Sequence, residues 1–176
     1  MSAPRRGADL RADLVDAYLF RRTPGGLELL QLRRADEPLE GTWQPVMGHA
    51  EPGESAPDAL WRELREETGL TPDSPSILGA WALEEVHPFF LARLNAVVLA
   101  PRFAVEVAPG WSWTPTRSGE HSAARWVHAD HADGAFLWPG QRAAVRELID
   151  TLAAPGSPAE PFLRLTRPGT TNASAT

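Results

Sequence analysis

The chain has 176 residues, enough for one domain with a sizeable core, and its 43% hydrophobic and 23% charged residues are ordinary for a soluble globular protein. The absence of cysteine excludes disulfides, thiolate metal sites and a cysteine nucleophile. The formal net charge of −6 argues against a broad basic surface for nucleic acid, and no apolar run is long enough for a signal peptide or a membrane span. We expect a cytoplasmic enzyme with no nucleic-acid and no membrane partner.

The first part of the chain predicts a β-hairpin followed by a short strand. Residues 1–12 are polar and are expected to form a flexible leader. Apolar β-formers at 14–20 and 27–32 flank a turn-rich stretch, which is the pattern of two antiparallel strands. Arg33 and Arg34 follow the second strand. Residues 42–47 are expected to form a short strand that leads into the next loop.

Helix signals mark residues 55–69. Ser55 followed by Asp58 resembles a capping box, with an acidic residue in place of the usual Glu, and Pro57 is tolerated in a first turn. Gly69 is placed to end the helix in a left-handed conformation. The sequence therefore predicts a helix with a defined start and stop.

Three carboxylates of this helix, on Glu63, Glu66 and Glu67, are spaced i, i+3, i+4 and so share one face. Like charges at this spacing are mildly destabilising. One interpretation is a solvated acidic face. The other is a site for a hard cation such as Mg²⁺, which prefers carboxylate and carbonyl oxygens and shares them with substrate phosphates.

The second half of the chain predicts further strands before a final helix. The expected strands are residues 77–86, 91–100, 103–107 and 123–127. The pattern of 91–100 also suits a short helix, and 109–120 is expected to be a long loop. Residues 139–152 predict an amphipathic helix with Val145, Leu148 and Ile149 facing inward. Strands on either side of a central helix, with this second helix near the end, indicate an α/β sandwich.

Residues 48–70, GHAEPGESAPDALWRELREETGL, resemble the Nudix box, G-x5-E-x7-R-E-U-x-E-E-x-G-U with U aliphatic, and match it at every fixed position. The resemblance implies the Nudix fold over residues 13–153: α/β (α+β), with a mixed β-sheet sandwiched between α-helices. It also implies hydrolysis of a nucleoside diphosphate linked to another moiety, dependent on Mg²⁺ or Mn²⁺. Residues 154–176, rich in Pro, Ala, Gly and Thr, are expected to be a tail without a core of its own.

The same resemblance assigns roles position by position. The implied metal ligands are Gly48 (through its carbonyl), Glu63, Glu66 and Glu67. Glu63 is alternatively the base that activates water. Arg62 and Glu54 would pair to hold the loop against the helix.

Glu120, His121 and Trp126 lie beyond the box in the run GEHSAARWV. From position alone, Glu120 is either an ordinary loop acid or a carboxylate that completes a metal site. The E-H-x4-W pattern is similar to that of two Nudix branches, the dATP and dihydroneopterin triphosphate pyrophosphatases and the asymmetric dinucleoside tetraphosphate hydrolases. In both, the acid at the position of Glu120 belongs to the metal site. His121 would orient that acid, touch phosphate or make a structural hydrogen bond, and the proton acceptor is Glu63 or Glu120.

Fewer residues indicate which of these two Nudix branches the sequence resembles more. Residues 43–48, WQPVMG, resemble the W-Q-x-V-x-G of the triphosphate pyrophosphatases, and residues 136–143 are similar to the same branch. Residues 48–49 and 51–54 instead resemble the tetraphosphate hydrolases. The nearest branch is taken to be the triphosphate pyrophosphatases, which release a monophosphate and pyrophosphate. Hydrolysis of dinucleoside polyphosphates or other nucleoside diphosphate compounds, and nucleotide sensing without turnover, are the alternatives.

Arg33, Arg34 and Trp43 are the candidate substrate-binding residues. Arginine binds phosphate by a two-pronged contact, and tryptophan can stack on a base or pterin ring. Surface charge for the arginines and packing for the tryptophan are the competing interpretations. The expected partner is a small nucleotide or pterin polyphosphate, and a homodimer is one option for the assembly.

Overall fold

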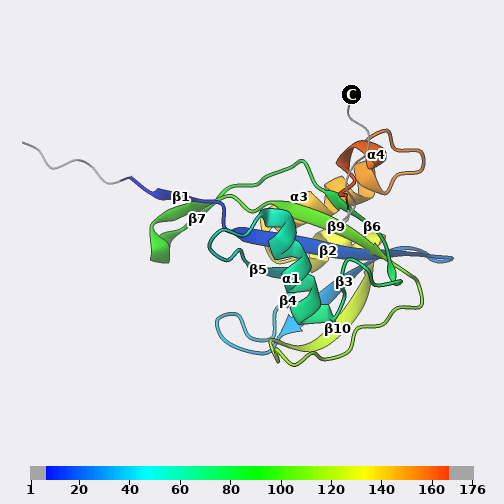
Figure 1. Cartoon of the computed structure of the whole chain (residues 1–176), viewed down its shortest axis with the longest axis horizontal. Coiled ribbons are helices and arrows are strands. Elements are labelled where there is room, and N and C mark those ends of the chain that lie inside the picture. The colour runs from blue at the N-terminus through cyan, green and yellow to red at the C-terminus, as the bar shows by residue number, and fades with distance from the viewer. Residues whose placement is uncertain (1–6, 167–176) are drawn as a thin grey trace, which may run out of the picture.

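The computed structural model describes residues 7–166 (Figure 1). Its centre is a mixed sheet in the order β10-β3-β2-β9-β6, in which β4 also pairs with β3 and β5 with β2. The strands of this sheet are β2 (Leu14–Thr23), β3 (Gly26–Arg34), β4 (Trp43–Gln44), β5 (Val46–His49), β6 (Ile77–Ala82), β9 (Arg102–Val107) and β10 (His121–His128). Strand β2 runs antiparallel to β3 and parallel to β9, so the predicted mixed sheet is confirmed.

Helices cover both faces of the sheet because the residues of β2 alternate between two apolar clusters. Val15 and Leu19 face α1 (Ala56–Thr68), where Leu60 and Leu64 join the same cluster. Tyr18 and Phe20 belong to the cluster under the other helices. These helices are α2 (Ala129–Ala135), α3 (Pro139–Glu147) and the π-helical turn η2 (Leu148–Leu152). The predicted sandwich is confirmed (Figure 1).

Capping residues define both ends of α1. Ser55 accepts a hydrogen bond from the backbone N–H of Asp58 at 3.2 Å. Gly69 has a φ of 75° and donates its backbone N–H to the carbonyl of Arg65, which closes the last turn. Helix α1 therefore begins and ends at defined residues, and its buried Leu60 and Leu64 determine which face it turns toward the sheet.

The single strand predicted at residues 91–100 is wrong. The chain there forms β7 (Phe89–Leu91), a 3₁₀ turn η1 (Ala92–Leu94) and β8 (Ala96–Val98). Asn95 adopts a φ of 48°, a left-handed conformation that asparagine tolerates, and this reverses the chain between the two strands.

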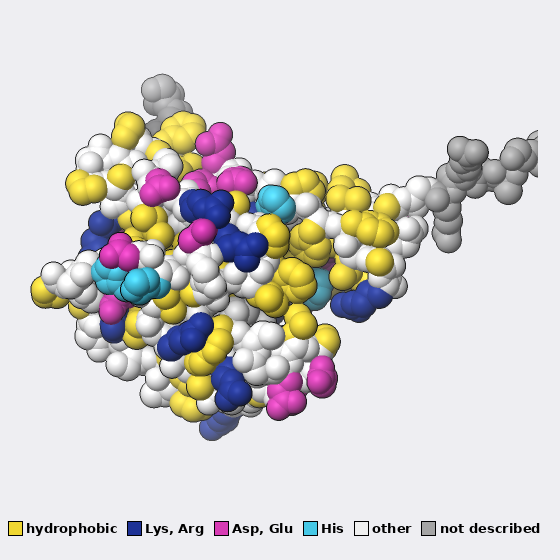
Figure 2. Space-filling model, turned by 180° about the vertical axis from the view of Figure 1, so that it is seen from behind, with side chains coloured by type: hydrophobic (Ala, Val, Ile, Leu, Met, Phe, Trp, Pro, Cys, Tyr) yellow, Lys and Arg dark blue, Asp and Glu magenta, His cyan; other side chains and the backbone are white. Residues whose placement is uncertain are grey.

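A small three-stranded sheet, in the order β1-β8-β7, projects from the body (Figure 1). Its first strand, β1 (Asp9–Arg11), lies within the leader expected to be flexible, so that expectation is wrong for these residues, while residues 1–6 lie outside the described part. Figure 2 shows hydrophobic side chains gathered on this projection, where Leu10 is 70% and Phe90 58% exposed.

Several other boundaries differ from the sequence prediction. Strand β6 ends at Ala82 and not near residue 86, and the short helix α2 was not predicted. The helix predicted at 139–152 exists but changes to π geometry at Leu148. Residues 109–120 hold neither helix nor strand, as expected. Within residues 7–166, no helix is long and apolar enough to cross a membrane.

The segment after η2 is ordered against the domain up to the last described residue. A short helix, α4 (Glu160–Leu163), precedes a bridge between Arg164 and Trp81 of β6. The backbone N–H of Leu165 then donates to the carbonyl of Ala80 at 2.8 Å. The expected tail therefore adds packing to the domain through residue 166, and residues 167–176 lie outside the described part.

Candidate metal and catalytic site

Arg62 joins the loop after β5 to helix α1. Its guanidinium donates to Glu54 from Nη2 at 3.0 Å and to the backbone carbonyl of His49 from Nη2 at 2.7 Å. Its Nη1 donates to Glu63 at 2.7 Å and reaches Glu66 at 3.4 Å. The structure thus places Arg62 and Glu54 together, as the resemblance implies, and one arginine orders the loop and two acids.

Glu63 lies against the backbone of Gly48. A Cβ atom at position 48 would overlap the Glu63 carboxylate, so glycine leaves the space in which that carboxylate lies against the β5 backbone. Glu63 is buried, and burial raises the pKa of its carboxyl while the Arg62 guanidinium lowers it. The negative charges of Glu66 and Glu120 raise it further, which shows that these acids share one electrostatic environment.

Glu67 is the most buried acid of the helix, with 1% of its surface exposed. Its Oε1 accepts the backbone N–H of Met47 at 3.4 Å, while its Oε2 has no hydrogen-bond partner among residues 7–166. Burial raises the pKa of Glu67 well above its usual value, and the charges of Glu63 and Glu120 act in the same direction. A nearby cation would reverse this effect by favouring the charged carboxylate.

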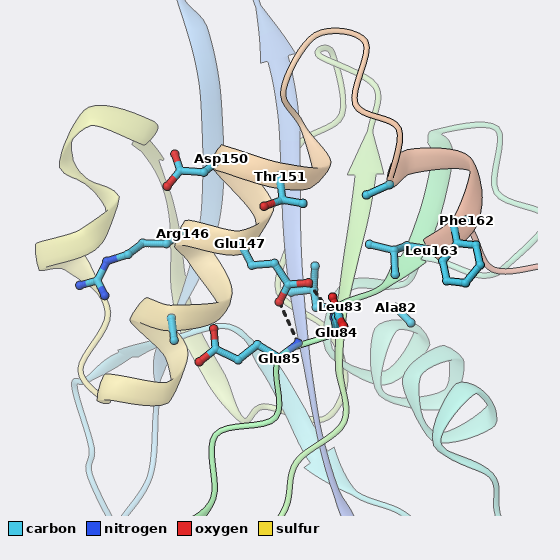
Figure 3. A pocket seen from close by; sticks show the side chains of 12 residues that line it. Ala82, Leu83, Glu84, Glu85, Arg146, Glu147, Asp150, Thr151, Phe162 and Leu163 are labelled. Carbon is cyan, nitrogen blue, oxygen red and sulfur yellow. Dashed lines mark hydrogen bonds between the residues drawn. The ribbon is translucent and has the colours of Figure 1, made fainter.

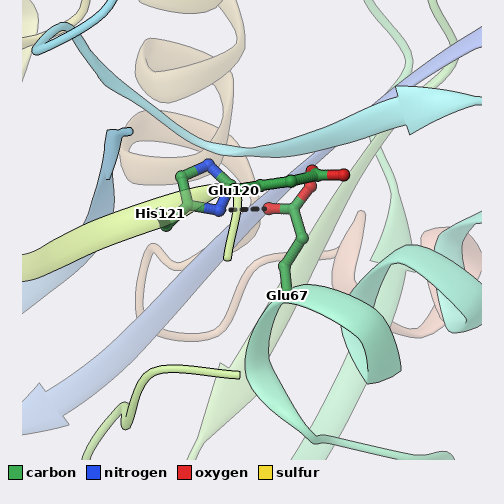
Figure 4. Close-up of side chains that lie close together, drawn as sticks. All are labelled: Glu67, Glu120 and His121. Carbon is green, nitrogen blue, oxygen red and sulfur yellow. Dashed lines mark ion pairs between the residues drawn. The ribbon is translucent and has the colours of Figure 1, made fainter. Parts of the chain in front are cut away.

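Glu120 and His121 reach Glu67 from the start of strand β10 (Figure 4). One ligand atom from each of these three side chains lies within 4.8 Å of the other two. His121 Nδ1 is 3.6 Å from Glu67 Oε2. Burial lowers the pKa of His121 to about 4, and the positive charge of Arg34 acts in the same direction, so the imidazole is neutral near pH 7. Glu120 itself is exposed.

Glu66 occupies a different position from the other two helix acids. Its side chain is 45% exposed and contacts Arg62 at 3.4 Å and Arg65 at 3.7 Å. It is not one of the residues whose ligand atoms cluster with Glu67 in the described part of the chain. The three carboxylates predicted to share one face therefore divide into two buried acids and one at the rim.

The three candidate substrate-binding residues lie on opposite faces of the sheet. Arg34 lies on the side of the sheet that α1 covers, and its positive charge acts to lower the pKa of both Glu67 and His121. Arg33 and Trp43 are cross-strand neighbours one position away in the register, so their side chains point to the other face. The guanidinium of Arg125 covers the Trp43 ring, 4.3 Å from its centroid. Only Arg34 is brought to the acids.

Contacts that fix Glu67 were not predicted from the sequence. The indole N–H of Trp113 donates to the backbone carbonyl of Glu67 at 2.8 Å. Gln44, on β4, contacts the far ring nitrogen of His121 at 3.1 Å. Both side chains come from segments distant in sequence, and only the W-Q letters before the box drew attention to one of them.

A second buried charged group lies on the opposite face of the sheet. Asp16 and Arg102, each 3% exposed, are neighbours on β2 and β9, with Arg102 Nε 3.4 Å from Asp16 Oδ2. The hydroxyl of Tyr18 donates to the same oxygen at 3.4 Å. Burial raises the pKa of Asp16, and the charge of Arg102 opposes this. A Cβ at Gly140 would overlap the Arg102 guanidinium, so the pair lies directly beneath the first turn of α3.

A cavity of about 960 Å³ lies away from the acids, between β6, α3 with η2, and α4 (Figure 3). Acidic side chains line it, and the Glu147 carboxylate accepts the backbone N–H groups of Glu84 at 2.6 Å and Glu85 at 3.0 Å. A smaller cavity of about 350 Å³ lies along the outer side of α1 and is lined by Glu54 and Arg62 among others. Neither is lined by Glu63, Glu67 or Glu120.

Solved structures share this fold. The dihydroneopterin triphosphate pyrophosphohydrolase of E. coli superposes with a TM-score of 0.65 at 20% identity, covering 80% of this chain and 98% of that one. An Ap4A hydrolase of C. elegans superposes with a TM-score of 0.64 at 18% identity, covering 79% and 96%. The two values are alike, so the fold does not separate the two branches named above.

Curated relatives are longer than the matched region. An octanoyltransferase of Myxococcus xanthus is 36% identical over 133 residues, which are 74% of this chain and 34% of that protein. An ADP-ribose pyrophosphatase of Methanocaldococcus jannaschii is 34% identical over 61 residues, 35% of this chain and 36% of that protein. The chain thus spans about a third of the length of these relatives. The family model of the NUDIX domain matches residues 11–148. With the box on α1 and this match over most of its length, the chain belongs to the NUDIX family.

Proposed function

We propose that this protein hydrolyses a phosphoanhydride in a nucleoside triphosphate-like substrate and releases a monophosphate and pyrophosphate. The observation that carries the proposal is the gathering of Glu63, Glu67 and Glu120 from two distant segments, with Gly48 against Glu63. Burying Glu63 and Glu67 near a third acid is costly, because burial and the negative charge of Glu120 both raise the pKa of these two carboxyls. Such an arrangement is expected where a cation neutralises the acids.

The donor atoms fit Mg²⁺ or Mn²⁺. Carboxylate oxygens are the ligands that hard divalent cations prefer, and Glu67 Oε2 is buried with no partner in the described chain. The residues that would hold the metal are Glu63, Glu67, Glu120 and, at the rim, Glu66, with the Gly48 carbonyl beside Glu63. Bound there, the metal would offset phosphate charge and lower the pKa of an attacking water.

The remaining steps belong to side chains of this protein. A carboxylate oxygen of Glu63 or Glu120 accepts a proton from the water that attacks phosphorus. Glu63 is held by Arg62 and is buried, whereas Glu120 is exposed at the mouth of β10. Arg34, whose charge acts on Glu67 from the same side of the sheet, would bind a substrate phosphate. Arg62 and Glu54 keep the loop and the helix in one arrangement.

The choice of a triphosphate substrate rests on sequence. The W-Q-x-V-x-G letters at 43–48 favour it over a dinucleoside polyphosphate. Gln44 of this motif contacts His121 inside the site, so one of the letters is part of the acid cluster's surroundings. The second candidate, hydrolysis of dinucleoside polyphosphates, is favoured by residues 48–49 and 51–54.

The test is a product assay on the purified chain with Mg²⁺ or Mn²⁺. Nucleoside triphosphates, dihydroneopterin triphosphate, diadenosine tetraphosphate and ADP-ribose are offered separately, and products are identified by chromatography and ³¹P NMR. We expect pyrophosphate and a monophosphate from a triphosphate. Two nucleotide products from diadenosine tetraphosphate, with no turnover of triphosphates, would establish the second candidate instead.

Variants connect the activity to the acids. Glu63→Gln, Glu66→Gln and Glu67→Gln should each lower kcat by about two orders of magnitude or more while the circular dichroism spectrum is kept. Glu85→Gln, at the distant cavity, is the matched control and should retain full activity. Binding of a nucleotide without hydrolysis of any substrate would support a sensor and overturn the proposal.

A further inference from the structure

Gln44, His121 and Glu67 form a line of buried side chains that crosses three elements. Gln44 Nε2 on β4 is 3.1 Å from His121 Nε2 on β10. The other ring nitrogen, His121 Nδ1, is 3.6 Å from Glu67 Oε2 on α1. The exposed fractions are 8%, 6% and 1% from Gln44 to Glu67, so none of the three lies in open solvent. Figure 4 shows the imidazole directed at the Glu67 carboxylate.

The contact with Gln44 suits one placement of the imidazole proton. The amide atom that faces the ring is Nε2, and in this orientation its NH₂ donates and His121 Nε2 accepts the hydrogen bond. A neutral imidazole carries its single proton on the other nitrogen, which is Nδ1. That N–H then faces Glu67 Oε2 across 3.6 Å, which is just beyond hydrogen-bond distance, and neither atom has a hydrogen-bond partner within residues 7–166.

The carboxylate of Glu67 is thereby approached from two sides. The backbone N–H of Met47 reaches Oε1 at 3.4 Å, and the His121 ring faces Oε2. A carboxylate has about four lone-pair directions, so two donors leave others for a ligand. Because two distant strands supply the donors, the orientation of the carboxylate is set by the sheet and not by the helix alone.

We propose that His121 is a positioning residue, whose Nδ1–H holds Glu67 Oε2 in the orientation that binds the divalent cation, and that Gln44 selects the tautomer that makes this possible. This inference rests on the proposed function, since it takes Glu67 to be a metal ligand. Partners of this kind orient the ligands of metal sites, and their loss costs affinity although they do not touch the metal.

The tautomer is measured first, in the metal-free full-length chain. Long-range ¹H–¹⁵N spectra of ¹⁵N-histidine-labelled protein distinguish protonated from unprotonated ring nitrogens, and His121→Asn identifies the signals. We expect His121 to be protonated at Nδ1 and unprotonated at Nε2. Protonation at Nε2 would overturn the proposal.

Metal affinity is measured second, by the EPR signal of free Mn²⁺ in titrations of the same chain. His121→Ala should weaken Mn²⁺ binding about 10- to 100-fold. His121→Asn places an amide N–H near the position of Nδ1 and should restore most of the affinity. His131→Ala, an exposed histidine of α2, is the control and should bind like the parent protein. Equal loss in the Ala and Asn variants would overturn the positioning role.

A change at Gln44 tests the second half of the proposal. Gln44→Leu removes the NH₂ donor without adding charge, so the His121 proton should no longer be confined to Nδ1 and Mn²⁺ binding should weaken even though His121 is kept. A ¹⁴N coupling from His121 to bound Mn²⁺, seen by pulsed EPR, would show direct ligation and overturn the proposal. If the parent protein binds no Mn²⁺ at all, the proposed function fails, whereas unchanged binding in His121→Ala refutes only this inference.

Discussion

The carboxylate of Glu63 lies directly against the backbone of Gly48, where any side chain at position 48 would overlap it. The backbone of Gly48 lies outside the left-handed region, so the requirement for glycine here is close approach and not conformation. A side chain at position 48 would therefore force the Glu63 carboxylate to move away from strand β5.

Gly48→Ala should displace the Glu63 carboxylate and lower kcat/KM by about 10²-fold, since small misplacements of catalytic groups have effects of this size. The added methyl should also lower the free energy of unfolding by about 1 to 3 kcal/mol. Steady-state kinetics and urea denaturation measure the two effects. Gly110→Ala is the matched control because nothing lies within 4 Å of a Cβ there. Full activity in Gly48→Ala would refute the role given to this contact.

Arg62→Ala should destabilise the protein by about 2 to 4 kcal/mol, because it removes charged hydrogen bonds and leaves the buried Glu63 unpaired. Arg62→Lys should fall between the parent and Ala, since an ammonium cannot reproduce the fork of contacts. Thermal unfolding measures both. Arg65→Ala removes one 3.7 Å contact of a 60% exposed side chain and should change stability by less than about 0.5 kcal/mol. A similar loss in both alanine variants would count against the special role of Arg62.

The metal-free protein should lose stability as pH rises, because the pKa of Glu67 is raised in the folded state. Between the unfolded pKa of about 4.3 and the higher folded pKa, the folded chain binds more protons than the unfolded chain. The contribution of Glu67 to the free energy of unfolding is therefore fully present at low pH and is lost as pH rises through this range. Glu67→Gln removes this contribution.

Thermal unfolding in EDTA from pH 5 to pH 8 tests this. The free energy of unfolding of Glu67→Gln should exceed that of the parent protein by an amount that grows with pH and reaches about 1 to 3 kcal/mol. Each kcal/mol corresponds to a rise of about 2 to 4 °C in Tm. Saturating Mn²⁺ should reverse the order, because it binds the charged carboxylate of the parent. A difference between the two proteins that does not vary with pH would contradict the assignment.

Asp16→Asn should destabilise the protein by about 3 to 5 kcal/mol, since it leaves the charge of Arg102 buried without a counter-ion. Replacing both partners, as Asp16→Leu with Arg102→Met, should cost less than either single change, because no buried charge remains. Urea denaturation of the parent protein, Asp16→Leu, Arg102→Met and the double variant forms a double-mutant cycle. Additive losses would show that the two residues do not interact.

Local features of this fold could be predicted from sequence where the determinants are neighbours in the chain. Ser55 and Gly69 mark the ends of α1 within a residue of the prediction, because caps depend on adjacent backbone groups. The turn at Asn95 was missed although asparagine is a known signal for it, since the apolar letters on both sides favoured one strand. The spacing of apolar residues along the sequence does not indicate where the chain reverses direction.

Contacts across the sheet could not be predicted in this way. Gln44 and His121 are 77 residues apart, and Asp16 and Arg102 are 86 apart. Their meeting depends on strand order and register, which alternation of polar and apolar residues does not specify. The box residues were found because the family motif records the outcome of that folding. His121 and Gln44 lie outside the box but within other runs that the sequence singled out, and only the fold shows their contact with each other and with Glu67.

The last described residues have a protective consequence. Strand β6 ends the large sheet, and an edge strand that is left uncovered can pair with another extended chain. The segment at 164–165 occupies part of that border through the bridge of Arg164 to Trp81 and the hydrogen bond of Leu165 to Ala80. Shortening the protein before Glu160 would remove both contacts and leave this part of the border open to pairing with an extended segment of another molecule.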